Sequence, residues 1–264
     1  MNILGISEGF HDAAVCVLRN NKIIFASQAE RFSGVKNDKW IHSNQLPKTE
    51  KYKPDVIAYY EKPFRKNLRR LYSGQGWKKN TTNFDVSFGH HESHAAAGYY
   101  TSPFNECNVL VIDAIGEWDT ISIWKGSVQN GYMGQRTHTL KKIKSWKYPY
   151  SLGLLYSAIT QRIGLKPNED EYITMGMAAF GEPIHNLEDQ LWKNNHKGVG
   201  NIFPKARSED LAASVQDLYE RELLKLVEMC PHENLVIMGG CALNCVANSK
   251  ITGKNIWIMP APGD

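Results

Sequence analysis

The chain has 264 residues, enough for one large domain or two small ones, and 42% of them are hydrophobic, so it can bury a full core. Its formal net charge of +4 is too small to indicate a nucleic-acid partner by itself. Five scattered cysteines argue against a disulfide framework and favour a reducing compartment. With no basic leader after Met1 and no apolar run of membrane-spanning length, we expect a cytoplasmic protein without a membrane partner.

Short apolar stretches alternate with turn residues through the first hundred positions, which indicates short strands and helices. The consecutive asparagines at positions 20 and 21 indicate a hairpin turn. In chain order we expect a strand meander (2–7, 13–19, 22–28), a strand (56–60), a basic helix (62–72), a strand (84–88) and a helix (91–100).

The same order of elements begins again near residue 108. We expect strands (108–113, 120–125, 135–141), a helix (151–163) with Leu152, Leu155, Tyr156 and Ile159 on one face, and a long irregular region (164–205). A helix capped by Ser208, Glu209 and Asp210 then runs to about Met229, followed by a strand (235–238), a helix (242–250) and a strand (255–259).

The repeated order of a meander followed by alternating helices and strands predicts an α/β protein with two lobes. It favours the two-lobed architecture of actin, sugar kinases and heat-shock ATPases. We expect the first lobe at residues 1–106 and the second, with nucleotide-binding turns, at residues 107–264. In that architecture the first hairpin of each lobe turns toward the nucleotide phosphates.

The strongest chemical motif is Gly89-His90-His91-Glu92-Ser93-His94, at the start of a predicted helix. Residues four apart lie on one helix face, so His90 and His94 can direct their imidazoles to one metal ion. His91 lies off that face. Glu92 holds the third place of the motif rather than the second, so zincin-type protease chemistry is not implied. The alternative is a helix start whose histidines cap it or lie at the surface.

Two aspartates that follow predicted strands are further candidate metal ligands. Asp113 ends an apolar strand, where a carboxylate is costly unless it is paired or binds a cation. Asp264 follows the last strand and a tight turn, and its alternative is a terminal residue without a role. A mixed set of histidine and carboxylate ligands suits iron, manganese or zinc.

Several turns are candidates for binding or proton transfer. His11 and Asp12 lie in the first hairpin turn, where they can position a substrate or act as a base, or can simply be polar tips. In the second hairpin turn Gly116 allows a phosphate to approach the backbone, with Glu117 and Trp118 beside it.

A further candidate nucleotide site follows the strand near residue 238. Gly239 and Gly240 open the next helix, whose N-terminus favours anions, and Asn244 and Asn248 on one face of that helix can contact a base or ribose. The acidic turn that contains Lys166 and Glu169 holds ribose hydroxyls or is a solvated loop.

Taken in order, these stretches resemble the O-carbamoyltransferase family of antibiotic and nodulation-factor biosynthesis over nearly the whole chain. The matching segments are Leu4-Gly5-Ile6-Ser7, His11-Asp12-Ala13, Glu30-Arg31-Phe32 with Lys36, residues 90–96, Asp113 with Gly116-Glu117-Trp118, and residues 151–154, 166–169, 175–181, 239–244 and 260–264.

The resemblance implies an N-terminal domain similar to the tRNA threonylcarbamoyl transferase, with a metal bound by His90, His94, Asp113 and Asp264. It implies ATP-dependent formation of carbamoyl-adenylate from carbamoyl phosphate and transfer of the carbamoyl group to an acceptor hydroxyl. His11 or Asp12 is the hypothetical acceptor of the hydroxyl proton, and Arg31 and Lys36 would offset developing negative charge. His91 is then a contact to phosphate or acceptor.

The chain departs from that family at its end. The adenylate-forming domain, and a helix expected after Asp264, do not occur before the sequence stops, so we expect either that the chain is a truncated or split piece or that a second chain or domain is a partner. The alternative function is a non-catalytic nucleotide-binding subunit of a carbamoyltransferase complex.

The acceptor is left open by the sequence. Two groups of basic residues with interleaved aromatic residues, at 62–79 and 141–148, suit a nucleic acid, so a hydroxymethylated base in DNA or RNA is one candidate acceptor. Solvated helix and hairpin faces explain the same residues equally well. A sugar or antibiotic hydroxyl is the acceptor implied by the resemblance.

Overall fold

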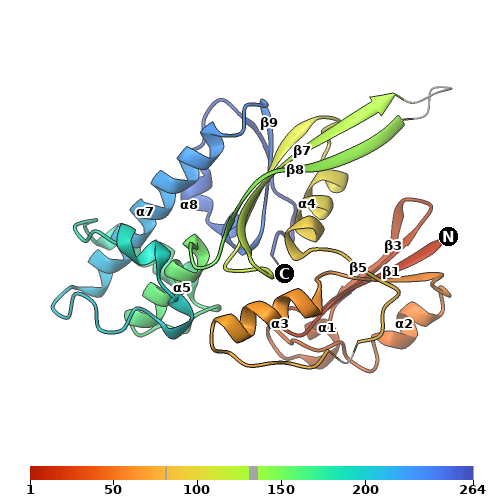
Figure 1. Ribbon diagram of the computed structural model, residues 1–264, viewed down its shortest axis with the longest axis horizontal. Coiled ribbons are helices and arrows are strands. Elements are labelled where there is room, and N and C mark those ends of the chain that lie inside the picture. The colour runs from red at the N-terminus through yellow and green to blue at the C-terminus, as the bar shows by residue number, and fades with distance from the viewer. Residues whose placement is uncertain (81, 131–135, 264) are drawn as a thin grey trace. The chain divides into compact units, whose positions relative to one another are not determined.

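The computed structural model describes residues 1–80, 82–130 and 136–263 (Figure 1). The chain divides into two compact units, residues 1–93 and 94–263. Asp264 lies outside the described residues, so its expected role as a metal ligand stays a prediction. The lobe boundary expected after residue 106 also stays a prediction.

The first unit contains one five-stranded sheet with the order β3-β2-β1-β4-β5. The meander strands β1–β3 are antiparallel, whereas β4 and β5 continue the sheet in parallel from β1. Leu4 and Ile6 of β1 pair with Val17 and Val15 of β2, and all four side chains are buried, as alternate residues of a strand require. The elements are β1 (Asn2–Ser7), β2 (Ala14–Arg19), β3 (Lys22–Gln28), α1 (Glu30–Ser33), α2 (Leu46–Glu50), β4 (Val56–Tyr59), α3 (Pro63–Tyr72) and β5 (Val86–Ser87).

The second unit contains a sheet with the order β10-β9-β6-β7-β8. Its meander and its two parallel strands repeat the order of the first sheet, so the predicted duplication of elements is confirmed. Its elements are β6 (Cys107–Ile112), β7 (Asp119–Asn130), β8 (Arg136–Lys147), α5 (Leu152–Arg162), α6 (Glu171–Met177), α7 (Ser208–Glu228), β9 (Asn234–Met238), α8 (Cys245–Asn248) and β10 (Asn255–Trp257). Helix α4 (His90–Thr101) begins at the end of the first unit and continues into the second.

Several predicted elements differ from those observed. β7 and β8 are longer than the expected strands because their ladder continues from the pair of Asp119 with Lys147 to the pair of Asn130 with Arg136. Polar residues on the exposed positions of β8 weaken its apolar pattern. Helix α6 lies within the region expected to be irregular. Helix α5 is buried on all sides from Leu152 to Thr160 rather than on one face, because both α7 and the sheet core pack against it.

Two helix starts also differ. Ser208 is the first residue of α7 rather than its cap, and Arg207 precedes it without a side-chain cap bond. The helix expected at residues 242–250 is a 3-10 turn (Gly240–Leu243) followed by the short helix α8, with Asn244 as its N-cap. Among the residues that the structure describes, no helix is both long and apolar enough to cross a bilayer.

Candidate functional site

The first turn of α4 is fixed by two side chains of its own sequence. The Gly89 amide donates to the Glu92 carboxylate (3.1 Å), which is the backward contact of a capping box. The Ser93 hydroxyl donates to the Tyr60 carbonyl at 2.8 Å, and Tyr60 directly follows β4. The Tyr60 ring also packs edge-on against the His90 ring, with 5.6 Å between the centroids. Glu92 therefore serves the helix start.

The predicted metal ligands of α4 come together with Asp113. His90, His94 and Asp113 are all buried, and each offers a ligand atom that lies within 4.8 Å of the others. His94 Nε2 lies 3.8 Å from Asp113 Oδ2. Two imidazoles and a carboxylate that converge in a buried place are a donor set that fits iron, manganese or zinc.

Asp113 is held in place by backbone amides at the ends of two parallel strands. Its Oδ1 accepts from the Ala114 amide at 2.8 Å and from the Gly240 amide at 3.4 Å. Because β6 and β9 are parallel neighbours, the residues after their carboxyl ends meet at one edge of the sheet. Gly239 has a φ of +91°, and a Cβ there would overlap the Ile112 carbonyl. The close approach at Gly239 is therefore to the neighbouring strand.

The second hairpin turn lies directly beside Asp113 in the chain. The Gly116 amide donates to the Asp119 carbonyl at 2.9 Å, Glu117 is buried, and the Trp118 carbonyl accepts from the Tyr148 amide. Ser151, the N-cap of α5, donates its hydroxyl to the Ala114 carbonyl at 2.6 Å. The helix start of α5 thus packs onto this turn. Contacts from Gly116, Glu117 or Trp118 to a nucleotide stay predictions.

The side chains of Asn244 and Asn248 stabilise their own segment. The Asn244 amide group exchanges hydrogen bonds with Gln216 (2.9 and 3.1 Å) and caps α8 by accepting from the Ala247 amide. Asn248 donates to the Ala242 carbonyl at 2.8 Å. Asn244 precedes α8 as its N-cap, and its carbonyl accepts from the Asn248 amide at 3.0 Å, so the two asparagines are one helical turn apart.

The loop before α6 is bonded within itself. Lys166 pairs with Glu169 at 2.5 Å, and the lysine side chain is two-thirds exposed. The Lys166 amide donates to the Asp170 carboxylate. These bonds make a compact exposed turn, and its contact with a ribose stays a prediction.

The first hairpin turn joins two of the predicted catalytic residues directly. His11 Nδ1 lies 2.8 Å from Asp12 Oδ2, and because a carboxylate only accepts, Nδ1 carries the proton and Nε2 is the basic nitrogen of the neutral ring. Asp12 has a φ of +51°, in the left-handed region that is uncommon for residues other than glycine. Backbone bonds from Gly9 to Lys39 and from Ala13 to Asp38 fix the turn.

Arg31 and Lys36 lie on the segment that leads to those backbone bonds. Arg31 is exposed and pairs with Glu30 at 2.9 Å, and Glu30 also accepts from the Asn37 amide. Lys36 is exposed. Both cations thus lie in the first unit, a few residues before Asp38 and Lys39, whose carbonyls bond to the His11 turn.

Among the described residues, the group that could hold a metal consists of two histidines and one aspartate and contains no cysteine. Burial, followed by the charges of Asp113 and Glu171, raises the pKa of the Cys241 thiol well above its ordinary value. Cys245 is exposed. The Tyr60 ring contacts the predicted ligand His90. The sequence does not predict this contact, because a tyrosine after a strand matches no metal or catalytic motif.

Comparisons with known proteins identify the family of the chain. The family model described as "Carbamoyltransferase N-terminus" matches residues 50–203 and 193–264. The uncharacterised protein sll1178 of Synechocystis sp. is 32% identical over all of this chain and 55% of its own length. The nodulation protein NolNO of Sinorhizobium fredii is 26% identical over 96% of this chain and 44% of its own length. The chain thus spans about half the length of the curated relatives it matches.

Solved structures support the fold. Component A of the (R)-2-hydroxyglutaryl-CoA dehydratase of Acidaminococcus fermentans is 14% identical, with a TM-score of 0.58 over 99% of this chain and 93% of that one. HypF of T. kodakarensis is 9% identical, with a TM-score of 0.51 over 98% of this chain and 45% of that one. The predicted actin-like ATPase fold is confirmed by these likenesses and by the two matching sheets. Because the family model covers most of its residues, the chain belongs to the carbamoyltransferase N-terminal family.

Proposed function

We propose that this chain carries the transfer site of a metal- and ATP-dependent O-carbamoyltransferase. In this proposal a carbamoyl group passes from carbamoyl phosphate, by way of carbamoyl-adenylate, to an acceptor hydroxyl. Membership of the family supports carbamoyl transfer. The observation that carries the location of the site is the buried group of His90, His94 and Asp113.

His90, His94 and Asp113 would hold the metal, with Asp264 as a further ligand. When bound, such an ion supplies Lewis-acid polarisation of carbamoyl or phosphate oxygens. Iron, manganese and zinc all suit this donor set. The capping contact from Gly89 to Glu92 and the bond from Ser93 to Tyr60 orient the helix turn that presents the histidines.

His11 would act as the general base. Asp12 keeps the Nδ1 proton in place, so His11 Nε2 takes the proton of the acceptor hydroxyl. The hydroxyl oxygen then bonds to the carbamoyl carbon, the bond from that carbon to the adenylate phosphate oxygen breaks, and AMP leaves with the bonding electrons. Arg31 and Lys36 would offset the negative charge on the leaving phosphate.

The nucleotide would lie against the turns that contain Gly116, Glu117 and Trp118, with Gly239 and Gly240 beside Asp113. We also predict contacts to the nucleotide from Lys166, Glu169, Asn244 and Asn248. Because the Asn244 side chain bonds to Gln216, Asn244 would position its segment rather than touch the nucleotide. Because the chain spans about half the length of its relatives, formation of carbamoyl-adenylate is assigned to a further domain or partner chain.

The acceptor that we favour is a small-molecule hydroxyl rather than a hydroxymethylated base in DNA or RNA. Many of the basic residues expected to face a nucleic acid bond within the protein instead. Arg69 donates to Gln75, Arg70 to backbone carbonyls, and Lys142 to Asp119. A shallow dependence of acceptor binding on salt would support a small-molecule acceptor, and a steep fall would support a polyanion.

Mass spectrometry of candidate acceptors tests the proposal. Incubation with the protein, its adenylate-forming partner domain, carbamoyl phosphate, ATP and metal should add one carbamoyl group to the acceptor. His90→Ala and His94→Ala should abolish this product, whereas His138→Ala, outside the ligand group, should retain it. A wild-type complex that binds nucleotide but gives no product with any acceptor would instead support a non-catalytic nucleotide-binding subunit.

A further inference from the structure

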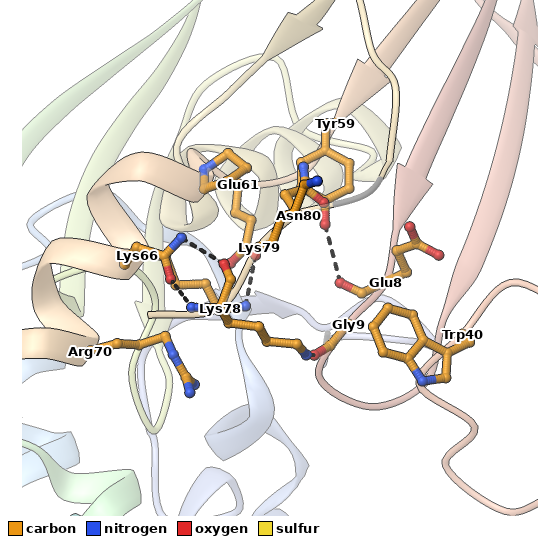
Figure 2. Close-up of a pocket in the computed structure, with 12 residues that line it drawn as sticks. Glu8, Gly9, Trp40, Tyr59, Glu61, Lys66, Arg70, Lys78, Lys79 and Asn80 are labelled. Atoms are coloured by element: carbon orange, nitrogen blue, oxygen red, sulfur yellow. Dashed lines mark hydrogen bonds and ion pairs between the residues drawn. The ribbon is translucent and has the colours of Figure 1, made fainter. Parts of the chain in front are cut away.

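A pocket in the first unit is lined in part by the turn that holds the proposed base. Glu8 and Gly9, from the turn that contains His11, form one side of it, and Trp40 borders it nearby (Figure 2). Tyr59 and Glu61, together with residues of α3 and of the segment after it, complete the lining, and the pocket is partly open to solvent. Four basic side chains line the pocket, Lys66, Arg70, Lys78 and Lys79, together with the carboxylates of Glu8 and Glu61.

The carboxylates neutralise only part of this positive charge. Glu61 pairs with Lys66 at 2.7 Å. Glu8 accepts from the Thr82 hydroxyl and the Ile41 amide, and in Figure 2 its carboxylate points away from the amino group of Lys78. The cations of Arg70 and Lys78 donate to backbone carbonyls, of Gly76 and Gln75 and of Gly9 respectively. Lys79 is exposed, and among the described residues no side-chain hydrogen bond or ion pair holds it.

Lys78 is held in place both at its backbone and at its amino group, which donates to the Gly9 carbonyl. Asn67 of α3 is buried, and its amide group bonds to both the carbonyl and the amide of Lys78, at 2.8 and 2.9 Å. The Lys78 amino group also lies 4.8 Å from the Trp40 ring centroid. Desolvation, followed by the neighbouring charges of Lys66, Lys39 and Arg70, lowers the pKa of Lys78. A bound anion would relieve that repulsion.

The pocket is close in the chain to both proposed reactive groups. Tyr59 and Glu61 line it, and Tyr60 between them packs against the candidate metal ligand His90. Gly9 lies two residues before His11. An anionic group seated here would contact the same turn that holds the base proposed to take the hydroxyl proton.

We propose that this pocket binds the phosphate group of a small phosphate ester, and that this ester is the hydroxyl-bearing acceptor of the carbamoyl group. A phosphate offers two charges and several acceptor oxygens to the cations of Arg70, Lys78 and Lys79. The assignment of the ester as acceptor rests on the proposed function. The binding of phosphate does not.

Calorimetric titration of the full chain with inorganic phosphate at low ionic strength tests the pocket without metal or transfer. Lys79→Glu should weaken phosphate binding by at least about tenfold, the loss expected when a hydrogen bond to a charged group is removed. Lys48→Glu, an exposed lysine of α2 that does not line the pocket, should leave binding unchanged. Failure of the wild-type chain to bind phosphate, or an equal loss in both variants, would overturn the proposal.

A competition experiment distinguishes the two candidate ligands of the pocket, an acceptor phosphate ester and the donor carbamoyl phosphate. Glycerol 3-phosphate should displace bound phosphate at a lower concentration than carbamoyl phosphate does, and neutral glycerol should not displace it. Displacement at lower concentration by carbamoyl phosphate would assign the pocket to the donor and overturn the acceptor assignment. Because neither readout needs product, each result stands whether or not carbamoyl transfer is observed.

Discussion

The Ser93 hydroxyl donates a 2.8 Å hydrogen bond to the Tyr60 carbonyl, and this bond ties the first turn of α4 to the end of β4. The turn contains His90, whose ring packs against Tyr60. The residue that orients the candidate ligand is thus a serine one position before His94. Its effect is to fix the rotation of the helix about its own axis.

Ser93→Ala should therefore lower both stability and metal affinity. Loss of one partly buried hydrogen bond should cost about 1 kcal/mol of unfolding free energy, measured by urea denaturation. Metal affinity, measured by titration with zinc, should fall as well because His90 is less well oriented. Ser249→Ala, which removes an exposed bond to the Val246 carbonyl, is the control and should leave zinc affinity unchanged.

Asp113→Asn should reduce metal binding more strongly than Ser93→Ala. The asparagine amide keeps the shape of the carboxylate but loses its negative charge. One of the two carboxylate oxygens is replaced by an NH₂ group, which donates hydrogen bonds and cannot bind a metal. We expect at least about a hundredfold loss of zinc affinity, more than the loss typical of an outer-shell change. Asp217→Asn on the exposed face of α7 is the matched control. Equal affinity in both variants would remove Asp113 from the ligand set.

Gly239→Ala should destabilise the second unit far more than Gly164→Ala. Both glycines have nearly the same φ, +91° and +89°, so the conformational cost of a side chain is alike. Only at position 239 would the new Cβ overlap a backbone carbonyl, whereas no atom lies within 4 Å of a Cβ at position 164. We expect about 1 kcal/mol for Gly164→Ala and on the order of 3 kcal/mol or more for Gly239→Ala, by urea denaturation. Similar losses would show that the strand contact is relaxed in solution.

The protein should lose stability as the pH rises above about 9, in part through Cys230. Burial raises the pKa of this thiol from 9.0 to about 11, with Lys254 opposing the shift. The folded state therefore holds the proton more tightly, so this contribution is fully present below pH 9 and is lost as the pH rises toward 11. The measurement is the free energy of unfolding at several pH values between 8 and 11.

Replacement of the thiol isolates that contribution. Cys230→Ala should flatten part of the pH dependence, whereas Cys245→Ala, at an exposed position, should leave the slope as it is in the wild type. An unchanged slope in the Cys230→Ala protein would mean that other groups, such as the buried tyrosines, account for the alkaline loss.

The sequence by itself determined the order of elements and the chemistry of the strongest motif. Period-two alternation places Leu4, Ile6, Val15 and Val17 on one face of two neighbouring strands, and consecutive asparagines fix the turn between the next two. Such patterns depend on neighbours in the chain, which is why the duplicated meander was predictable. His90 and His94 were predictable as a pair because their spacing matches one turn of a helix.

Only the tertiary structure decided which distant groups meet. Asp113 comes within 3.8 Å of His94 because of the way α4 packs against its sheet, and no local pattern encodes that distance. The same holds for Asn244. Its sequence position suggests a ligand contact, but its side chain bonds to Gln216 of α7. The Lys78 backbone, likewise, is held by the buried amide of Asn67, and its amino group by the distant Gly9 carbonyl. Side-chain partners far apart in sequence follow from how the faces of helices and sheets fit together, a property of the packed chain as a whole.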